Sequence, residues 1–152
     1  MDVVTYEPHV AEIDKLIRRV SFVIKCRGRD ILSEFGITTP QFNALLVLRD
    51  NGDMTIGDLG NKLYLASSTA TDLIDRMERD GLVLRERDSR DRRVVRLYML
   101  EKGHQMIREV MENRKRYLSD LLEQISAEEI EALQKALGSL YVLMKPPCKK
   151  CD

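Results

Sequence analysis

The spacing of the apolar residues changes twice along this chain, at Gly81 and again near Lys102. Over residues 66–81 the apolar side chains recur every three to four positions, which is the spacing of one helix face. Over residues 94–100 they alternate from side to side, as in a strand with one buried face. After Lys102 the helical spacing returns. The pattern therefore predicts a short β segment placed between helices.

Further helices are predicted before this point. A long amphipathic helix covers about residues 10–35. A second helix opens at "TTPQF", with Thr39 as its N-cap and Pro40 at the first helical position, and Gly52 ends it. Thr55 is the expected N-cap of a short third helix. This third helix and the one that follows it form a helix-turn-helix.

The second half of the chain completes the predicted architecture. The β-rich stretches "LVLRE" and "VVRLYML" flank the polar segment "RDSRDRR", which indicates a β-hairpin directly after the helix-turn-helix. Two long helices follow over residues 102–124 and 126–145, and Ser126 and Glu129 have capping-box spacing at the start of the last one. We therefore expect a mainly α fold with a small β-hairpin wing, a winged helix-turn-helix carried between long N- and C-terminal helices.

Length and composition favour one globular domain. A chain of 152 residues with 43% hydrophobic content fits a single domain over residues 1–145, followed by a short Cys-containing tail at 146–152. No apolar run is long enough to cross a bilayer, and the opening "MDVVTYEPH" lacks the features of a secretion signal. Three cysteines in such a chain argue against a disulfide scaffold. We expect a cytoplasmic protein with no membrane partner.

Arginine is concentrated in the predicted hairpin. The stretch "RERDSRDRRVVR" at residues 85–96 holds six arginines and three acids, although the whole chain has a formal net charge of zero. A hairpin with arginines at its turn can place a guanidinium in the narrow minor groove of DNA, where the negative potential is deepest. The candidates for that contact are Arg90, Arg92 and Arg93. The candidates for contacts with the phosphate backbone are Arg85, Arg87 and Arg96. A charge-rich hairpin that merely favours solubility is the alternative.

The helix over residues 66–81 is the candidate recognition helix. Its predicted inner face consists of Ala70, Leu73, Ile74 and Met77. Its predicted outer face, which would enter the major groove, carries Ser68, Thr71, Asp72, Asp75, Arg76 and Arg79. The predicted DNA-binding residues of this helix are Ser67, Ser68, Thr69, Thr71, Asp72 and Arg76. Residues 67–80 hold four acids and two arginines, a balance that a polyanion disfavours, although the pairs Asp72–Arg76 and Asp75–Arg79 have ion-pair spacing. The alternative is a surface helix with ordinary solvated pairs.

The segments "GITTPQFNALLVL" and "TIGDLGNKLYLASSTATDLIDRMERDGLVLRERDSRDRRVVRLYMLEKG" resemble the MarR family of bacterial transcriptional regulators. The resemblance covers nearly the whole chain, and its most specific part runs from Asp80 to Gly103. It implies a homodimeric DNA-binding regulator, acting as a repressor that a small-molecule effector releases. It also implies that Asp91 is a buttressing acid and that Arg93 is the arginine inserted in the minor groove.

The resemblance further implies a division of the chain. Residues 37–100 would form the winged helix-turn-helix, and residues 9–36 and 101–145 would form dimerisation helices. The residues give independent support, because these helices carry more apolar surface than a small winged domain covers. A second copy of the chain is the simplest partner that would bury this apolar surface, and two-fold pairing matches a pseudo-palindromic DNA site.

The sequence does not match the sensor sites of the family. Peroxide-sensing relatives carry a cysteine early in the first helix, where this chain has Asp14, and zinc-sensing relatives use a histidine pair where this chain has His104 followed by Arg108. The tail residues Cys148 and Cys151 have C-x-x-C spacing, and a dimer with neighbouring C-termini would supply four thiolates to zinc. A disordered, lysine-bearing tail is the alternative, and we expect no metal and no cofactor.

The predicted function is that of a sequence-specific DNA-binding transcriptional regulator, with duplex DNA and a second copy of the chain as partners. A winged-helix dimer that binds a protein is the alternative from another class. An enzyme is disfavoured, because the sequence contains no G-x-S-x-G, H-E-x-x-H, P-loop or dinucleotide-binding motif.

Overall fold

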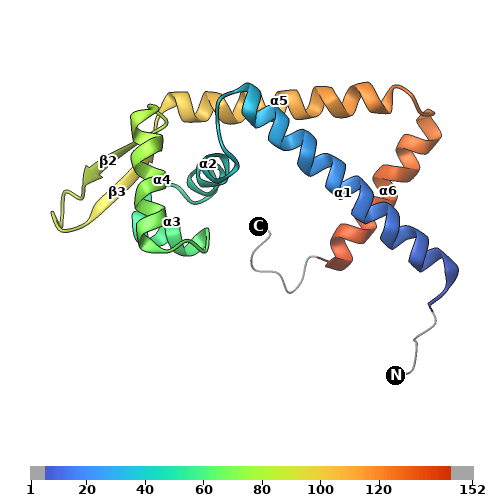
Figure 1. The fold of residues 1–152 in the computed structure, drawn as a ribbon, viewed down its shortest axis with the longest axis horizontal. Coiled ribbons are helices and arrows are strands. Elements are labelled where there is room, and N and C mark those ends of the chain that lie inside the picture. Colours follow the sequence, from blue (N-terminus) through green and yellow to red (C-terminus); the bar gives the residue numbers. More distant parts are fainter. Residues whose placement is uncertain (1–5, 145–152) are drawn as a thin grey trace. The chain divides into compact units, whose positions relative to one another are not determined.

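The computed structural model describes residues 6–144 (Figure 1). This part of the chain contains six α-helices and three short strands. In chain order they are α1 (Pro8–Glu34), α2 (Thr39–Asn51), β1 (Met54–Thr55), α3 (Ile56–Lys62), α4 (Ser67–Arg79), β2 (Val83–Arg87), β3 (Val95–Met99), α5 (Glu101–Leu122) and α6 (Ala127–Met144). The predicted fold, mainly α with a small β-hairpin wing, is confirmed. None of the described helices is both long and apolar enough to span a membrane.

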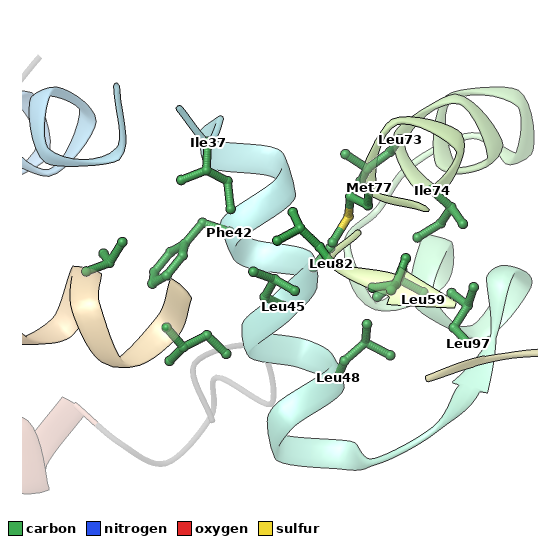
Figure 2. Close-up of a cluster of buried hydrophobic side chains, with 14 of the residues drawn as sticks. Ile37, Phe42, Leu45, Leu48, Leu59, Leu73, Ile74, Met77, Leu82 and Leu97 are labelled. Carbon is green, nitrogen blue, oxygen red and sulfur yellow. The ribbon is translucent and has the colours of Figure 1, made fainter. Parts of the chain in front are cut away.

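The described chain divides into two compact units, and the boundary lies within α5 between Glu112 and Asn113. The first unit contains the core, which gathers around α2 (Figure 2). Phe42, Leu45 and Leu48 of α2 are at most 3% exposed and share one cluster with buried side chains of α3, α4 and the sheet. The predicted inner face of α4 is confirmed, since Ala70, Leu73, Ile74 and Met77 are all buried. Because one face holds α4 on the core, its opposite face is left to solvent.

A three-stranded antiparallel sheet follows α4, in the order β1–β3–β2. Strands β2 and β3 form the predicted hairpin, with Val83 opposite Met99 and Arg87 opposite Val95. Strand β1 was not predicted from the sequence, and it pairs Met54 with Leu97 on the other edge of β3. The hairpin, called the wing below, is therefore anchored through β3 to the segment that precedes α3.

Side chains cap three of the helices. The N-cap of α2 is Thr38, so the prediction of Thr39 is wrong by one residue and Pro40 lies in the second helical position. The Thr38 hydroxyl accepts a hydrogen bond from the main-chain nitrogen of Gln41 at 3.4 Å, and Gln41 Oε1 accepts one from the main-chain nitrogen of Thr38 at 2.9 Å. This reciprocal capping box needs a glutamine three residues after the cap, which only Thr38 has. The caps predicted for α3 and α6, at Thr55 and Ser126, are confirmed.

Gly103 lets α5 start close to the wing. A β-carbon at this position would lie 2.8 Å from the carbonyl oxygen of Leu82 and 2.7 Å from Cγ of Met99. The same Leu82 carbonyl accepts a hydrogen bond from the Leu100 amide nitrogen at 3.0 Å. The first turn of α5 is therefore fixed against the base of the hairpin.

The terminal helices leave apolar side chains in contact with solvent. On α1, the exposed apolar residues include Ile13, Leu16, Ile17, Val20, Val23 and Ile24. Helix α6 buries none of its residues, and its exposed apolar residues include Leu133, Leu137, Leu140 and Tyr141. Stripes of this size mark surfaces that bind another apolar surface.

Candidate nucleic-acid interface

Helices α3 and α4 form a helix-turn-helix, and all six predicted DNA-binding residues of α4 are exposed. They are Ser67, Ser68, Thr69, Thr71, Asp72 and Arg76. The hydroxyls cluster in the first two turns, where the Thr71 Oγ1 donates to the Ser67 carbonyl oxygen at 2.9 Å. The Thr71 oxygen keeps its lone pairs for an outside donor. The N-terminal part of α4 therefore presents hydrogen-bonding groups that are free to meet base edges.

The acids in the second half of α4 have a different partner from the one predicted. Asp75 pairs with Arg85 of strand β2, at 2.5 Å between Oδ1 and Nη2, and not with Arg79. No ion pair joins Asp72 to Arg76 in the described part of the chain. The helical i,i+4 pairing predicted from spacing is therefore wrong, because a strand packed beside the helix supplies a guanidinium with better geometry.

Arg85 also binds Glu78, one turn further along α4. Its Nη2 and Nε donate to the two oxygens of the Glu78 carboxylate at 3.1 and 3.3 Å, and its main-chain nitrogen donates to Glu78 Oε2 at 3.0 Å. This two-pronged contact matches the planar fork of a guanidinium. The hydrogen bond from the Arg85 side chain is the main reason that the pKa of Glu78 is lowered. The hydrogen bonds that the Arg85 side chain donates to Glu78 and then to Asp75 are the largest causes of the raised pKa of Arg85.

Asp88 organises the turn of the wing. Its Oδ1 accepts from the main-chain nitrogens of Arg90 at 2.7 Å and of Asp91 at 3.3 Å, and its Oδ2 accepts from Arg96 Nε at 2.7 Å. The hydrogen bond from Arg96 is the largest cause of the lowered pKa of Asp88, and the Arg90 amide follows. One carboxylate thus ties the turn to strand β3.

Asp91 supports the arginine that the family resemblance assigns to the minor groove. Asp91 Oδ1 accepts from the main-chain nitrogen of Arg93 at 3.0 Å, and the Asp91 carbonyl accepts from Val94 at 2.9 Å. The contact is to the backbone of Arg93 and not to its guanidinium. It therefore shapes the turn and leaves the charge of Arg93 available.

The six arginines of the hairpin fall into two groups. Arg85 and Arg96 are half-buried and held in ion pairs, Arg96 by both Asp88 and Asp53. The expectation that these two contact the phosphate backbone is not supported, because their guanidinium groups already bind carboxylates. The exposed arginines are Arg87, Arg90, Arg92 and Arg93. The wing therefore separates arginines that hold its shape from arginines that face solvent.

The end of α4 is anchored by residues that no sequence pattern singled out. Gln41, buried to 6% exposure, donates through Nε2 to Asp80 Oδ2 at 3.1 Å, and Lys102 Nζ donates to the Asp80 carbonyl oxygen at 2.6 Å. Helices α2, α4 and α5 therefore meet at Asp80. Asp80 and Lys102 lie in the most specific part of the family resemblance, but nothing in the sequence indicated that they meet, and the glutamine in α2 carried no signal.

Within the described residues, Cys26 and the side chains that commonly ligate metals form no candidate metal site. Arg29 Nη2 donates to Cys26 Sγ at 3.3 Å on α1. No cluster of three or more His, Cys, Asp or Glu side chains suited to a metal lies within residues 6–144. Cys148 and Cys151 lie outside the described residues, so the structure does not bear on them.

Known proteins resemble this chain over most of its length. The MarR family pattern matches residues 37–95. A Bacillus subtilis (strain 168) protein named as the uncharacterized HTH-type transcriptional regulator YsmB is 49% identical over 137 residues, which cover 90% of this chain and 94% of that protein. The organic hydroperoxide resistance transcriptional regulator of the same organism is 31% identical over 133 residues, covering 83% of this chain and 89% of that protein.

A solved structure agrees with both the fold and the sequence. It is that of a MarR family protein from Bacillus stearothermophilus, which is 50% identical and superposes with a TM-score of 0.77. The match covers 93% of this chain and 99% of the other. The similarity therefore extends beyond the helix-turn-helix to the flanking helices.

Proposed function

Since this chain belongs to the MarR family, we propose that it is a homodimeric transcriptional regulator that binds a pseudo-palindromic DNA site, represses from it, and leaves it when a small-molecule effector binds. Such a protein works beside the chromosome, in the cytoplasm. The observation that carries the proposal is the wing turn. Exposed arginines sit on a turn shaped by Asp88, in the same compact unit as the exposed face of α4.

Helix α4 would read the major groove. Its exposed hydroxyls and Arg76 are donors and acceptors for base edges, and a recognition helix contacts bases through its N-terminal residues. The residues assigned to this role are Ser67, Ser68, Thr69, Thr71, Asp72 and Arg76. The winged helix-turn-helix over residues 37–100 would form the DNA-binding part of one domain that spans residues 1–145.

The wing would bind the adjacent minor groove. Arg93 is the assigned minor-groove contact, with Arg90 and Arg92 beside it on the same turn, and all three are exposed. Asp91 would act through the backbone of Arg93, whose amide it holds. A turn fixed in advance loses less conformational entropy when DNA binds.

The exposed apolar stripes support the homodimer. Helices α1 and α6 carry apolar side chains that are more than a third exposed in the single chain, such as Ile17 at 45% and Leu137 at 56%. A second copy would cover these stripes and place two α4 helices on one face of a duplex.

The test is to let the chain select duplexes from fragments of its source genome and to measure binding to the selected site as a function of salt. We expect a two-fold-related site and a steep fall of affinity with salt, because released counterions drive phosphate binding. Weak binding to duplex DNA that depends on neither salt nor base sequence would contradict the proposal and favour a winged helix that binds a protein.

A further inference from the structure

The candidate recognition helix α4 carries more acidic than basic residues, and an arginine on the neighbouring strand β2 neutralises part of this excess. Residues 67–80 hold four acids and two arginines. Two of those acids, Asp75 and Glu78, are paired with Arg85 of β2. We infer that Arg85 is a positioning residue for DNA recognition, which acts mainly by neutralising these two carboxylates and also holds the wing to α4. This inference rests on the proposed function.

The geometry makes Arg85 a connector between the two DNA-binding elements. It lies on β2, the first strand of the wing, and its three donor groups bind Asp75 and Glu78 on α4. The side chain of Arg85 is 28% exposed, against 44% for Asp75 and 34% for Glu78. A guanidinium held on two carboxylates in this way does not extend to a phosphate. Its contribution is therefore made through α4 and not by touching DNA.

The charges explain why α4 needs a partner. Asp75 lies seven residues after Ser68, two helical turns along the same side of α4. A free carboxylate there would face the same polyanion as the recognition residues, and like charges oppose association. With Arg85 the three groups sum to −1, since two carboxylates carry −2 and one guanidinium +1. Without Arg85 they sum to −2.

The pKa directions agree with this inference. The hydrogen bonds from Arg85 lower the pKa of Glu78, as expected for a carboxylate paired with a guanidinium. The fork contact also restrains the angle between α4 and β2, because both oxygens of Glu78 are engaged. Charge and position are thus supplied by one side chain.

The experiment measures binding of the full chain to a duplex of about 30 base pairs that the unsubstituted chain has selected from a random pool. Arg85→Gln should weaken binding by about ten-fold at about 50 mM salt and by only about three-fold at 300 mM, because salt screens the unpaired carboxylates. The triple variant Arg85→Gln, Asp75→Asn, Glu78→Gln removes those carboxylates. It should bind within about three-fold of the unsubstituted chain.

The matched control breaks a similar pair outside the winged helix-turn-helix. Arg108 Nη2 binds Glu101 Oε1 at 2.7 Å on α5, and Arg108→Gln should change affinity by less than about two-fold. Thermal unfolding of each variant reports whether it is folded. If Arg85→Gln does not fold, the double variant Asp75→Asn, Glu78→Gln keeps Arg85 and removes only the acids, and it should bind more tightly than the unsubstituted chain.

The outcomes separate this inference from the proposed function. If the unsubstituted chain binds duplex and Arg85→Gln binds equally well, Arg85 has no such role and the proposed function stands. A triple variant as weak as Arg85→Gln would also overturn the inference, since charge would not be the cause. A double variant that binds more weakly would do the same. If the unsubstituted chain binds no duplex, both fail together.

Discussion

The side-chain amide of Gln41 donates to the carboxylate of Asp80 across 3.1 Å, joining the first turn of α2 to the residue that ends α4. Replacing the amide with a carboxylate, Gln41→Glu, keeps the capping box but sets two negative charges against each other. We expect a loss of about 1 to 2 kcal/mol in the free energy of unfolding at pH 7, measured by urea denaturation.

The pH dependence of that variant has a defined sign. The repulsion requires both carboxylates to be ionised, so folding of the variant favours uptake of a proton and stability should recover as the pH falls towards about 4. The control is Gln105→Glu, where an exposed amide donates to Glu109 at 2.7 Å and the same change should cost less than about 0.5 kcal/mol. Equal losses at both positions would contradict the role given to Gln41.

Gly103→Ala tests the close approach of α5 to the hairpin. The added methyl group would lie 2.8 Å from the main-chain oxygen of Leu82, which has little room to move. We expect a loss of about 1 to 3 kcal/mol in unfolding free energy. The control is Gly138 on α6, where an added methyl group would meet no heavy atom within 4 Å beyond its own helical backbone. Gly138→Ala should raise the unfolding free energy by up to about 1 kcal/mol. A Gly103→Ala protein as stable as the unsubstituted chain would show that the backbone at Leu82 moves to make room for the methyl group.

Arg93→Ala separates the wing from the recognition helix. If Arg93 anchors the wing in the minor groove, its loss should weaken binding to all site variants and reduce the slope of log K against log salt by about one unit. Arg76→Ala should instead relax the preference at particular base pairs, at a cost of about 1 to 3 kcal/mol if a two-pronged base contact is lost. Arg114→Ala on α5 should change neither quantity. An unchanged salt slope for Arg93→Ala would show that the wing does not bind DNA.

Asp88→Asn should loosen the turn of the wing. The carboxylate accepts from the Arg90 amide, and hydrogen exchange of that amide, followed by NMR, reports on the contact. The pKa of Asp88 is lowered in the folded chain, so its contribution is present above the unfolded pKa of about 4 and is lost as the pH falls through the lower folded value. Protection of the Arg90 amide should therefore fall in acid, and in Asp88→Asn it should be low already at pH 7.

The control for that experiment is Asp14→Asn, which breaks an exposed pair with Arg18 on α1. It should leave the exchange of the Arg90 amide unchanged at every pH. Equal protection of this amide in Asp88→Asn and the unsubstituted chain at pH 7 would refute the structural role of Asp88.

Leu137→Glu tests the proposed dimer. The side chain is 56% exposed on α6, so a charge is tolerated in the single chain but opposed in an apolar interface. Analytical ultracentrifugation at micromolar concentration should show a dimer for the unsubstituted chain and a shift towards monomer for Leu137→Glu. Ser139→Glu adds the same charge to the opposite side of the same helix and should remain dimeric. Truncation after Ser119 removes α6 but keeps the core of the first unit, so it should abolish dimerisation, and a dimer of the truncated chain would contradict the proposal.

The predictable parts of the fold were those in which a periodic pattern of apolar residues repeats several times. Helix α4 and its inner face followed from apolar residues repeated over about two turns, and the hairpin followed from alternation. Strand β1 has two residues, Met54 and Thr55, which is too few to show any period. The cap of α2 was misplaced because two threonines stand side by side, and only the distance to Gln41 decides between them.

The candidate site was predictable as a set of exposed residues but not as a set of partners. Spacing along α4 suggested that Asp75 pairs with Arg79, and a local pattern has no information about the strand that packs beside it. In the sequence, Arg85 and Arg96 looked equivalent to Arg87, as candidates for contacts with the phosphate backbone. Their distinction depends on where Glu78 and Asp88 lie, which is a tertiary property.

The turn of the wing has consequences for how such a protein diverges. Its shape depends on Asp88 and Arg96, which point back into the hairpin, while the exposed arginines contribute side chains without determining the path of the backbone. Substitutions at Arg90 or Arg92 therefore alter what the wing touches and leave the fold intact. Substitutions at Asp88 alter every contact at once. Under the proposed function, contacts with DNA can therefore change at Arg90 and Arg92 without loss of the fold, but not at Asp88.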